Sequence, residues 1–157
     1  MHFREWLVDV SLGNDLGLFW RLFRLRERSG SRFLADILTF LLNRMAHKRG
    51  GYIGRGAKIA SVPSLPHGLH GIYISRYASV GSGCRIYQNV TIGEVGGKAP
   101  RIGNGCLIGA NAVLVGDIRI GDNVRIGAGA VVSGDVPESC TVVAQPFRVI
   151  VRKTPVR

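Results

Sequence analysis

The chain has 157 residues, and its 21 basic and 10 acidic side chains give a formal net charge of +11. This length allows one domain with a buried core, and the charge favours anionic partners, although no long basic run is present and nucleic acid is not expected. The three cysteines form no CxxC motif or disulfide framework, and no apolar stretch is long enough for a bilayer, so we expect a cytoplasmic protein without membrane spans.

Two amphipathic helices are predicted in an N-terminal region of residues 1–51. The first covers about residues 14–28, with apolar residues at helical spacing and arginines on the other face, and the second covers about residues 32–48. A basic, aromatic helix fits a peripheral contact with the inner face of an anionic membrane. We favour packing of residues 14–28 on the rest of the protein or on a neighbouring subunit, because repeat folds need caps at their ends.

A six-residue rhythm from residue 74 onward predicts an all-β solenoid. An aliphatic residue returns at every sixth position, and a small or branched residue stands two positions before it. The aliphatic positions are Ile74, Val80, Ile86, Ile92, Ile102, Ile108, Leu114, Ile120, Ile126 and Val132. A period of six fits neither a helix nor a simple strand, but it fits short strands and tight turns wound into a parallel β-helix. The glycines after the aliphatic residues are expected to let the backbone turn corners without a Cβ clash.

We predict the β-helix over residues 52–143, with two interruptions. The repeat shifts phase by about three residues between Leu65 and Ile74. Residues 93–101 are rich in glycine and lengthen one repeat, which is typical of a functional loop on a rigid solenoid. Residues 144–157 form a closing segment with a basic tail.

The irregular stretch after Leu65 contains the two strongest candidates for chemistry, His67 and His70. Histidine as a residue type suits general-base catalysis near neutral pH. Taken alone, the residues leave open that both are loop histidines with no task, and His47 is interpreted as a charge at a helix end. No third ligand stands at a suitable spacing, so no metal site is expected.

Residues 42–149 resemble the hexapeptide-repeat acyltransferases and, within them, the serine O-acetyltransferase branch. The segments that carry the resemblance are NRMAH at 43–47, GRGAKI at 54–59, HG at 67–68, IYQNVTIG at 86–93, IGANA at 108–112, IGAGAVV at 126–132 and DVP at 135–137. The resemblance implies a left-handed β-helix, a homotrimer, and acetyl-CoA as co-substrate without a metal. The short helical N-terminus looks most like that of O-acetyltransferases of exopolysaccharide and capsule gene sets.

By this resemblance His67 is the catalytic base, which takes a proton from an acceptor hydroxyl as its oxygen attacks the thioester of acetyl-CoA. Transfer is then direct, in a ternary complex, and the CoA arm lies in a groove between two subunits. The residues expected to line this groove or to hold the CoA phosphates are Gly93, Lys98, Ala110, Ala128 and Arg148. Further candidates for substrate contacts are His70, Tyr52 and Tyr87.

Three departures from the serine acetyltransferase pattern argue for another acceptor. The resemblance implies an orienting aspartate and a substrate-binding aspartate where this chain has Tyr52 and Pro66, and an Arg-His pair where it has Lys98-Ala99. Serine carries two charges that need partners once they are desolvated. We therefore expect a sugar or glycan hydroxyl as acceptor, acidic or lipid-linked. A divergent serine O-acetyltransferase of cysteine biosynthesis and a non-catalytic trimeric scaffold are the alternatives.

Overall fold

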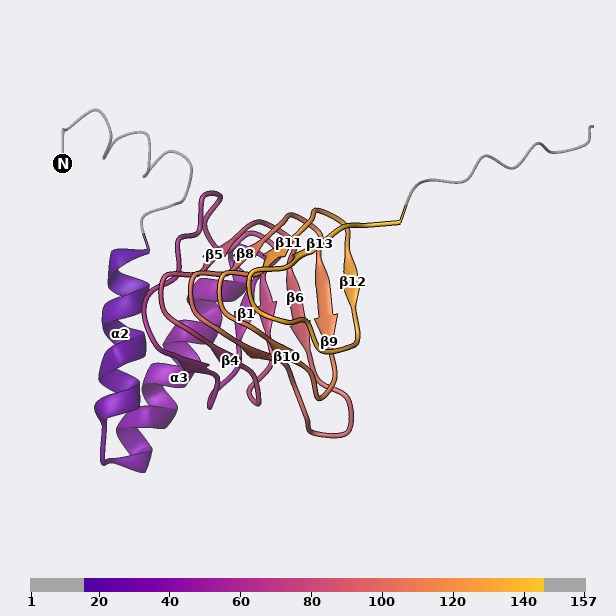
Figure 1. Ribbon diagram of the computed structural model, residues 1–157. Coiled ribbons are helices and arrows are strands. Elements are labelled where there is room, and N and C mark those ends of the chain that lie inside the picture. Colours follow the sequence, from indigo (N-terminus) through magenta and orange to yellow (C-terminus); the bar gives the residue numbers. More distant parts are fainter. Residues whose placement is uncertain (1–15, 146–157) are drawn as a thin grey trace, which may run out of the picture.

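The computed structural model describes residues 16–145, which form a pair of helices and a left-handed parallel β-helix (Figure 1). The helices are α2 (Gly17–Arg28) and α3 (Arg32–His47). Three parallel sheets follow and form the faces of a prism, as the sequence pattern predicts. Sheet A contains β1 (Tyr52–Ile53), β3 (Tyr73–Ile74), β6 (Thr91–Gly93), β9 (Val113–Val115) and β12 (Val131–Val132). Sheet B contains β2 (Lys58–Ile59), β4 (Ser79–Val80), β7 (Arg101–Ile102) and β10 (Arg119–Ile120). Sheet C contains β5 (Arg85–Ile86), β8 (Leu107–Ile108), β11 (Arg125–Ile126) and β13 (Thr141–Val142).

Each coil of the prism gives one strand to each sheet, in the order A, B, C. The second coil consists of β3, β4 and β5, the third of β6, β7 and β8, and the fourth of β9, β10 and β11. In the first coil Ser64 takes the place of a sheet C strand and bridges to Arg85. We call the corner between sheets C and A the CA edge, and the corner between sheets A and B the AB edge.

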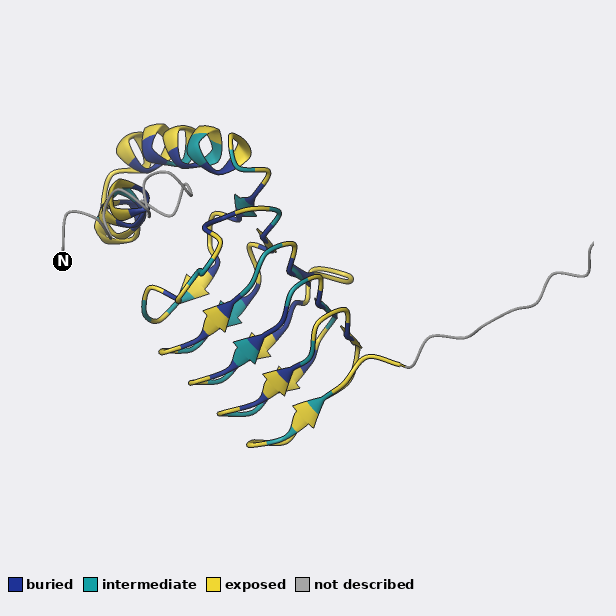
Figure 2. Ribbon diagram, turned by 90° about the horizontal axis from the view of Figure 1, so that it is seen from above, coloured by how far each residue is buried: buried dark blue, intermediate teal, exposed yellow. Residues whose placement is uncertain are grey.

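The interior of the prism confirms the predicted six-residue pattern. All ten aliphatic positions are buried, with at most 5 % of each residue exposed, and the small residues two positions earlier are buried with them (Figure 2). Strands pair in register, so that Ile74, Ile92 and Leu114 lie above one another in sheet A. Stacking the same kind of side chain in each coil gives a continuous apolar column, which stabilises a solenoid through its nearest-neighbour contacts.

Cys84 and Cys106 lie inside this column, on neighbouring coils, as small apolar residues do. Their Sγ atoms donate to the carbonyl oxygens of Gly103 and Gly121, each at 3.2 Å. The hydrogen bond between the two thiols lowers the pKa of Cys84 to about 7 and raises the pKa of Cys106. Both sulfurs are enclosed by the coils, so we assign these cysteines to packing and not to chemistry.

The glycines that follow the aliphatic residues serve a different purpose from the predicted one. A Cβ at Gly81 would lie 2.4 Å from the carbonyl oxygen of Gly103 in the next coil, and Gly81 itself does not have a positive φ. The left-handed corners are instead at positions such as Asn89 and Asn111, with φ of 57° and 59°. Glycine is therefore needed at position 81 for the close approach of two coils, while asparagine, which tolerates this conformation, turns the corner.

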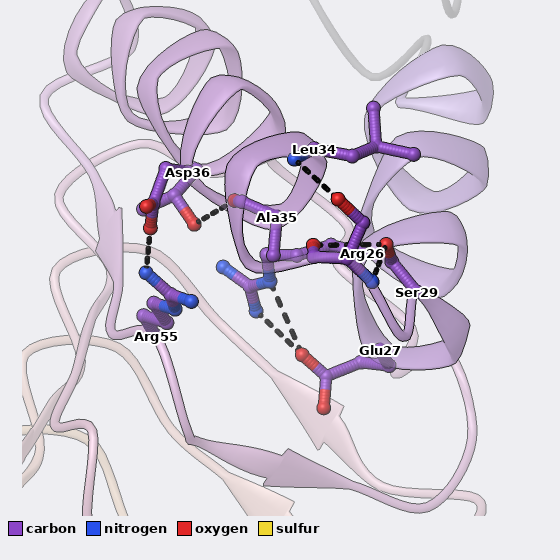
Figure 3. A network of polar contacts seen from close by, with 9 residues as sticks. Arg26, Glu27, Ser29, Leu34, Ala35, Asp36 and Arg55 are labelled. Carbon is purple, nitrogen blue, oxygen red and sulfur yellow. Dashed lines mark hydrogen bonds and ion pairs between the residues drawn. The ribbon is translucent and has the colours of Figure 1, made fainter.

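The helical pair closes the first coil of the prism, as the packing hypothesis requires. Phe19, Trp20 and Phe23 of α2 are buried in the same core cluster as the prism residues. The guanidinium of Arg26 lies 4.6 Å from the ring centroid of Phe23 and pairs with Glu27, and Asp36 of α3 pairs with Arg55 of the first coil (Figure 3). The aromatic face that a membrane contact would use is thus covered by protein.

The outer side of α3 differs from that of an ordinary surface helix. Ala35, Leu38, Leu42 and Ala46 face inward, whereas Phe33 and Phe40 stay 76 % and 64 % exposed.

Within residues 16–145, no helix is both long enough and apolar enough to cross a bilayer.

Candidate active site

His67 lies on the CA edge, in the irregular turn that leads from the first coil to the second. Its ring is exposed, and its centroid lies 6.1 Å from that of the Tyr87 ring. Gly68 and Gly71, with φ of 62° and 65°, allow the tight turn that displays it. A solvent-accessible imidazole on a rigid corner is suited to meet a substrate from outside the chain.

His70 lies in the same turn and fixes its shape. The Nδ1–H of His70 donates to the carbonyl oxygen of His67, at 2.5 Å, and the His70 carbonyl accepts from the backbone N–H of Asn89, at 2.9 Å. His70 therefore holds the backbone of His67 against the second coil. The structure gives it this positioning contact, and its predicted contact with the substrate stays a prediction.

The CA edge continues from this turn as a regular column of residues. Arg85, Leu107 and Arg125 pair in register, so Gln88, Ala110 and Ala128, three positions later, lie on the same edge in successive coils. The backbone N–H groups of Asn89, Asn111 and Gly129 donate to the carbonyl oxygens of His70, Gln88 and Ala110, at 2.9, 3.1 and 2.8 Å, so His70 continues this column into the irregular turn. His67 precedes it in the inserted part of the turn, beside Tyr87. The short methyl side chains of Ala110 and Ala128 leave room for a ligand along the backbone.

The loop of residues 93–101 lies on the AB edge, between β6 and β7. Gly93 is buried at the end of β6, where an added Cβ would contact Val115 at 3.1 Å. Lys98, predicted as a phosphate partner, pairs through Nζ with Asp117 at 2.9 Å, and Arg101 pairs with the same carboxylate at 2.7 Å. The hydrogen bond from Lys98, together with the charges of Lys98 and Arg101, lowers the pKa of Asp117 below its usual 3.8. Asp117 thus holds the base of the loop.

Replacing Asp117 by asparagine should release the loop at neutral pH. Because the pKa of Asp117 is lowered in the folded protein, its ion pairs persist at acidic pH and are lost only as the pH falls through that lowered pKa. In the native chain, the protection of the loop amides from hydrogen exchange should therefore be constant from pH 5 to 8. Because the pair is exposed, we expect about two- to fivefold faster amide exchange over residues 94–98 in Asp117→Asn. Hydrogen exchange followed by mass spectrometry measures it, and unchanged exchange would contradict the anchoring role.

Tyr52 and Tyr87, the remaining predicted substrate contacts, occupy different places. Tyr87 is beside His67, whereas Tyr52 lies on the outer face of sheet A and stacks on Tyr73, with ring centroids 5.1 Å apart. Arg148 lies outside the described residues. The structure therefore places Tyr87 beside His67, puts Ala110 and Ala128 on the same edge in later coils, and leaves Tyr52 on the face next to them.

The predicted site residues form two groups on opposite edges of sheet A. His67, Tyr87, Ala110 and Ala128 are on the CA edge, and Gly93 and Lys98 are on the AB edge. Gln88 and Glu94 are six positions apart across the sheet, at most about 20 Å at the rise of a strand. The two groups therefore flank sheet A on its two edges.

Two polar groups near these edges were missed by sequence reasoning. The Oε1 atom of Gln88 is buried and, among the described residues, has no hydrogen-bond partner. The carboxylate of Glu94 accepts from the hydroxyl of Ser75, at 2.5 Å, and Ser75 is only 1 % exposed. The signal for Glu94 was present in the sequence, because it is the one acidic residue of the inserted loop.

Comparison with known proteins identifies the repeat. The model of the bacterial transferase hexapeptide (six repeats) matches residues 99–134. A serine acetyltransferase from Synechococcus elongatus is 46 % identical over 107 residues, which cover 66 % of this chain and 43 % of that protein. A serine acetyltransferase from Staphylococcus epidermidis is 33 % identical over 134 residues, 83 % of this chain and 59 % of that protein. The chain thus spans about half the length of these relatives.

Solved structures of serine acetyltransferases are also similar to this chain. Neisseria gonorrhoeae serine acetyltransferase in complex with serine superimposes with a TM-score of 0.71 at 36 % identity, over 83 % of this chain and 55 % of that one. Serine acetyltransferase from Brucella abortus gives a TM-score of 0.73 at 32 % identity, over 84 % and 55 %.

The prism of six-residue repeats with a histidine at one edge defines a hexapeptide-repeat β-helix. Within that class, residues 99–134 match the bacterial transferase hexapeptide family, and the similarity of the chain to serine acetyltransferases extends over most of its length.

Proposed function

We propose that this chain is an acetyl-CoA-dependent O-acetyltransferase with His67 as general base. The observation that carries the proposal is the CA edge, where an exposed histidine lies beside Tyr87 and the edge continues through Gln88 to Ala110 and Ala128. The imidazole supplies a base, and the methyl side chains leave a strip of backbone for an extended acyl carrier. Ala110 and Ala128 would line the pantetheine arm, with Gly93 and Lys98 contributed from the AB edge of a neighbour.

The reaction follows from these groups. Nε2 of His67 takes the proton from the acceptor hydroxyl as its oxygen attacks the thioester carbonyl of acetyl-CoA. The tetrahedral oxyanion is stabilised by backbone N–H groups of the turns. When the C–S bond breaks, the histidine returns the proton to the CoA sulfur, which leaves an acetyl ester and free CoA. No acyl-enzyme is needed, because both substrates are bound together.

We propose a homotrimer built on sheet A. The outward side chains of this sheet are uncharged, whereas Lys58, Arg101 and Arg119 face outward from sheet B and Arg85 and Arg125 from sheet C. Charged residues are depleted at interface cores, which favours sheet A. Cyclic packing through this face sets the CA edge of one subunit against the AB edge of the next, so that both groups of site residues meet.

Serine is the first candidate acceptor. Relatives that match over 83 % of this chain are named serine acetyltransferases, and a neighbour of 36 % identity is in complex with serine. An amino-acid acceptor would carry its ammonium and carboxylate into the groove, where both need charged partners. The loop that would reach the groove carries the acidic Glu94 and the basic Lys98.

A sugar or glycan hydroxyl is the second candidate, and one observation favours it. The positions that the family resemblance assigns to substrate or histidine charges hold Tyr52, Pro66 and Ala99, of which Tyr52 stacks on Tyr73 and Ala99 is buried. None of the three can pair with an ion. A saccharide needs only the base, hydrogen bonds and stacking, and the net charge of +11 suits an acidic glycan. We place the activity in the cytoplasm.

An acceptor panel separates these candidates. Release of CoA from acetyl-CoA is followed with L-serine, with neutral sugars and nucleotide sugars, and with acidic oligosaccharides, for the native chain and for His67→Ala. Turnover with serine supports the first candidate and overturns the argument from Tyr52, Pro66 and Ala99. Turnover confined to a saccharide supports the second. Absence of CoA release with every acceptor would favour the non-catalytic trimeric scaffold.

A further inference from the structure

We propose that Glu94 of one subunit is the partner of His67 in the neighbouring subunit and orients its imidazole. The inference rests on the proposed function and adds a residue that this function lacks. Each active site is then built from two copies of the chain, because His67 and Glu94 lie on opposite edges of sheet A within any one copy.

The part of the chain that the structure describes gives the His67 ring no orienting partner. Among residues 16–145 it makes a ring contact with Tyr87 and no hydrogen bond, although its backbone is fixed by His70. A general base works best when a third group holds its tautomer and direction. Tyr52 and Pro66 stand at the two positions where the resemblance implies carboxylates, so a carboxylate from elsewhere is needed.

Glu94 offers a carboxylate that is fixed and not neutralised. Its Oε2 accepts from the buried hydroxyl of Ser75, which also accepts from the backbone N–H of Tyr77 at 3.2 Å. Within the described residues Glu94 makes no ion pair, and the one lysine of its loop, Lys98, is paired with Asp117. The residue itself is exposed, so its carboxylate is held on one side and stays accessible to a neighbouring chain.

Both groups adjoin the second coil of the prism. Ser75 follows β3 in the second coil, and its hydrogen bond holds the carboxylate of Glu94, from the loop of the third coil, beside that coil. His67 lies in the turn from the first coil to the second, and its ring contacts Tyr87, which follows β5 in the second coil. Rotation about an axis parallel to the prism leaves height unchanged, so a cyclic trimer joins groups of similar height. Glu94 and the His67 turn lie on the two edges that sheet A packing brings together.

Mixed trimers give the decisive test. Glu94→Gln and His67→Ala chains are co-expressed with different tags, and trimers that carry both tags are assayed for CoA release. If each site takes His67 from one chain and Glu94 from the next, every trimer that carries both tags holds one native site, so about a third of the native activity should return. If both residues come from one chain, no mixed site is native, and activity no higher than the average of the two parent variants would overturn the proposal.

The kinetic constants distinguish an orienting role from a general loss of structure. Glu94→Gln alone should lower kcat about tenfold or more, with the KM values for acetyl-CoA and acceptor little changed, because the base loses alignment while the groove stays intact. Glu138→Gln is the matched control, an exposed glutamate elsewhere on the prism, and should leave kcat unchanged. A rise in acceptor KM with unchanged kcat would instead assign Glu94 to the acceptor and overturn its role towards His67.

A cross-link tests the geometry even if the chain has another activity. The double variant His67→Cys, Glu94→Cys is treated with a short bismaleimide and separated under denaturing conditions. Since every chain then carries both halves of the contact, covalent dimers and trimers are expected, whereas each single variant should give no more product than the native chain with its Cys140. Monomer alone in the double variant would overturn the contact, whatever the acceptor panel shows.

Discussion

Replacing His67 by alanine should reduce acetyl transfer by about 10²- to 10⁴-fold, the range that a positioned general base contributes. The imidazole is exposed on the CA edge and is not part of the core, so its removal should leave the fold and the unfolding midpoint unchanged. Release of CoA, followed with a thiol reagent, measures the loss, and circular dichroism checks the fold.

Two other histidines serve as controls for this result. His47 ends α3 and is interpreted as a charge at the helix end, so His47→Ala should keep full activity. His70→Ala removes the hydrogen bond to the carbonyl of His67 and should cause a smaller loss than His67→Ala. Undiminished CoA release by His67→Ala would rule out both acceptor hypotheses as they are stated here, since each depends on this base.

The largest expected effect on stability comes from adding a single methyl group at Gly81. A Cβ there would lie 2.4 Å from Gly103 O, 2.6 Å from Gly103 C and 2.8 Å from Asn104 N, all of them backbone atoms of the next coil. The coils must separate to admit it, which strains the 2.9 Å hydrogen bond from Gly81 N to Ile102 O. We expect Gly81→Ala to lower the free energy of unfolding by about 3 kcal/mol.

Gly134→Ala is the matched control, because the same methyl group would meet no atom within 4 Å and Gly134 does not have a positive φ. At such a site alanine restricts the unfolded chain, so stability should stay equal or rise by about 0.4–1 kcal/mol. Urea denaturation at one fixed protein concentration compares the two variants, since assembly couples stability to concentration. Equal midpoints for both variants would show that the coils do not approach as closely as the structure has them.

Most of the fold could be predicted from the order of the residues. The period of six states which side chains point inward, and every predicted position from Ile74 to Val132 is buried. The two helices fall where helical spacing, Ser31 and the Gly50-Gly51 pair indicate. The reason is local: a two-residue strand and a tight turn are specified by a few neighbouring residues, and each coil repeats the same solution.

The candidate site was predicted only in part. The sequence indicated which residues are candidates, but it did not show which of them lie close together in space. His67 and Lys98 were recognised as separate candidates, but the sequence did not state that they lie on opposite edges of sheet A. The insertions around His67 and in residues 93–101 break the count of residues per coil, so the edge of each residue cannot be obtained by counting. The same difficulty concealed Glu94, whose height is set by a hydrogen bond to Ser75, nineteen positions earlier.

The sequence by itself determined the inward positions, the repeat, the inserted loop and the histidine of the irregular turn. Only the tertiary structure decided which of these meet: the contact of His67 with Tyr87 on the edge of Gln88, Ala110 and Ala128, the burial of the aromatic face of α2, and the division of the site between two edges. The direction of a side chain follows from the alternation of residues within a single strand. Which residues of two coils lie beside each other depends on the register between the coils, and every insertion shifts that register. A shift of a few residues moves a side chain to another edge without changing any local pattern.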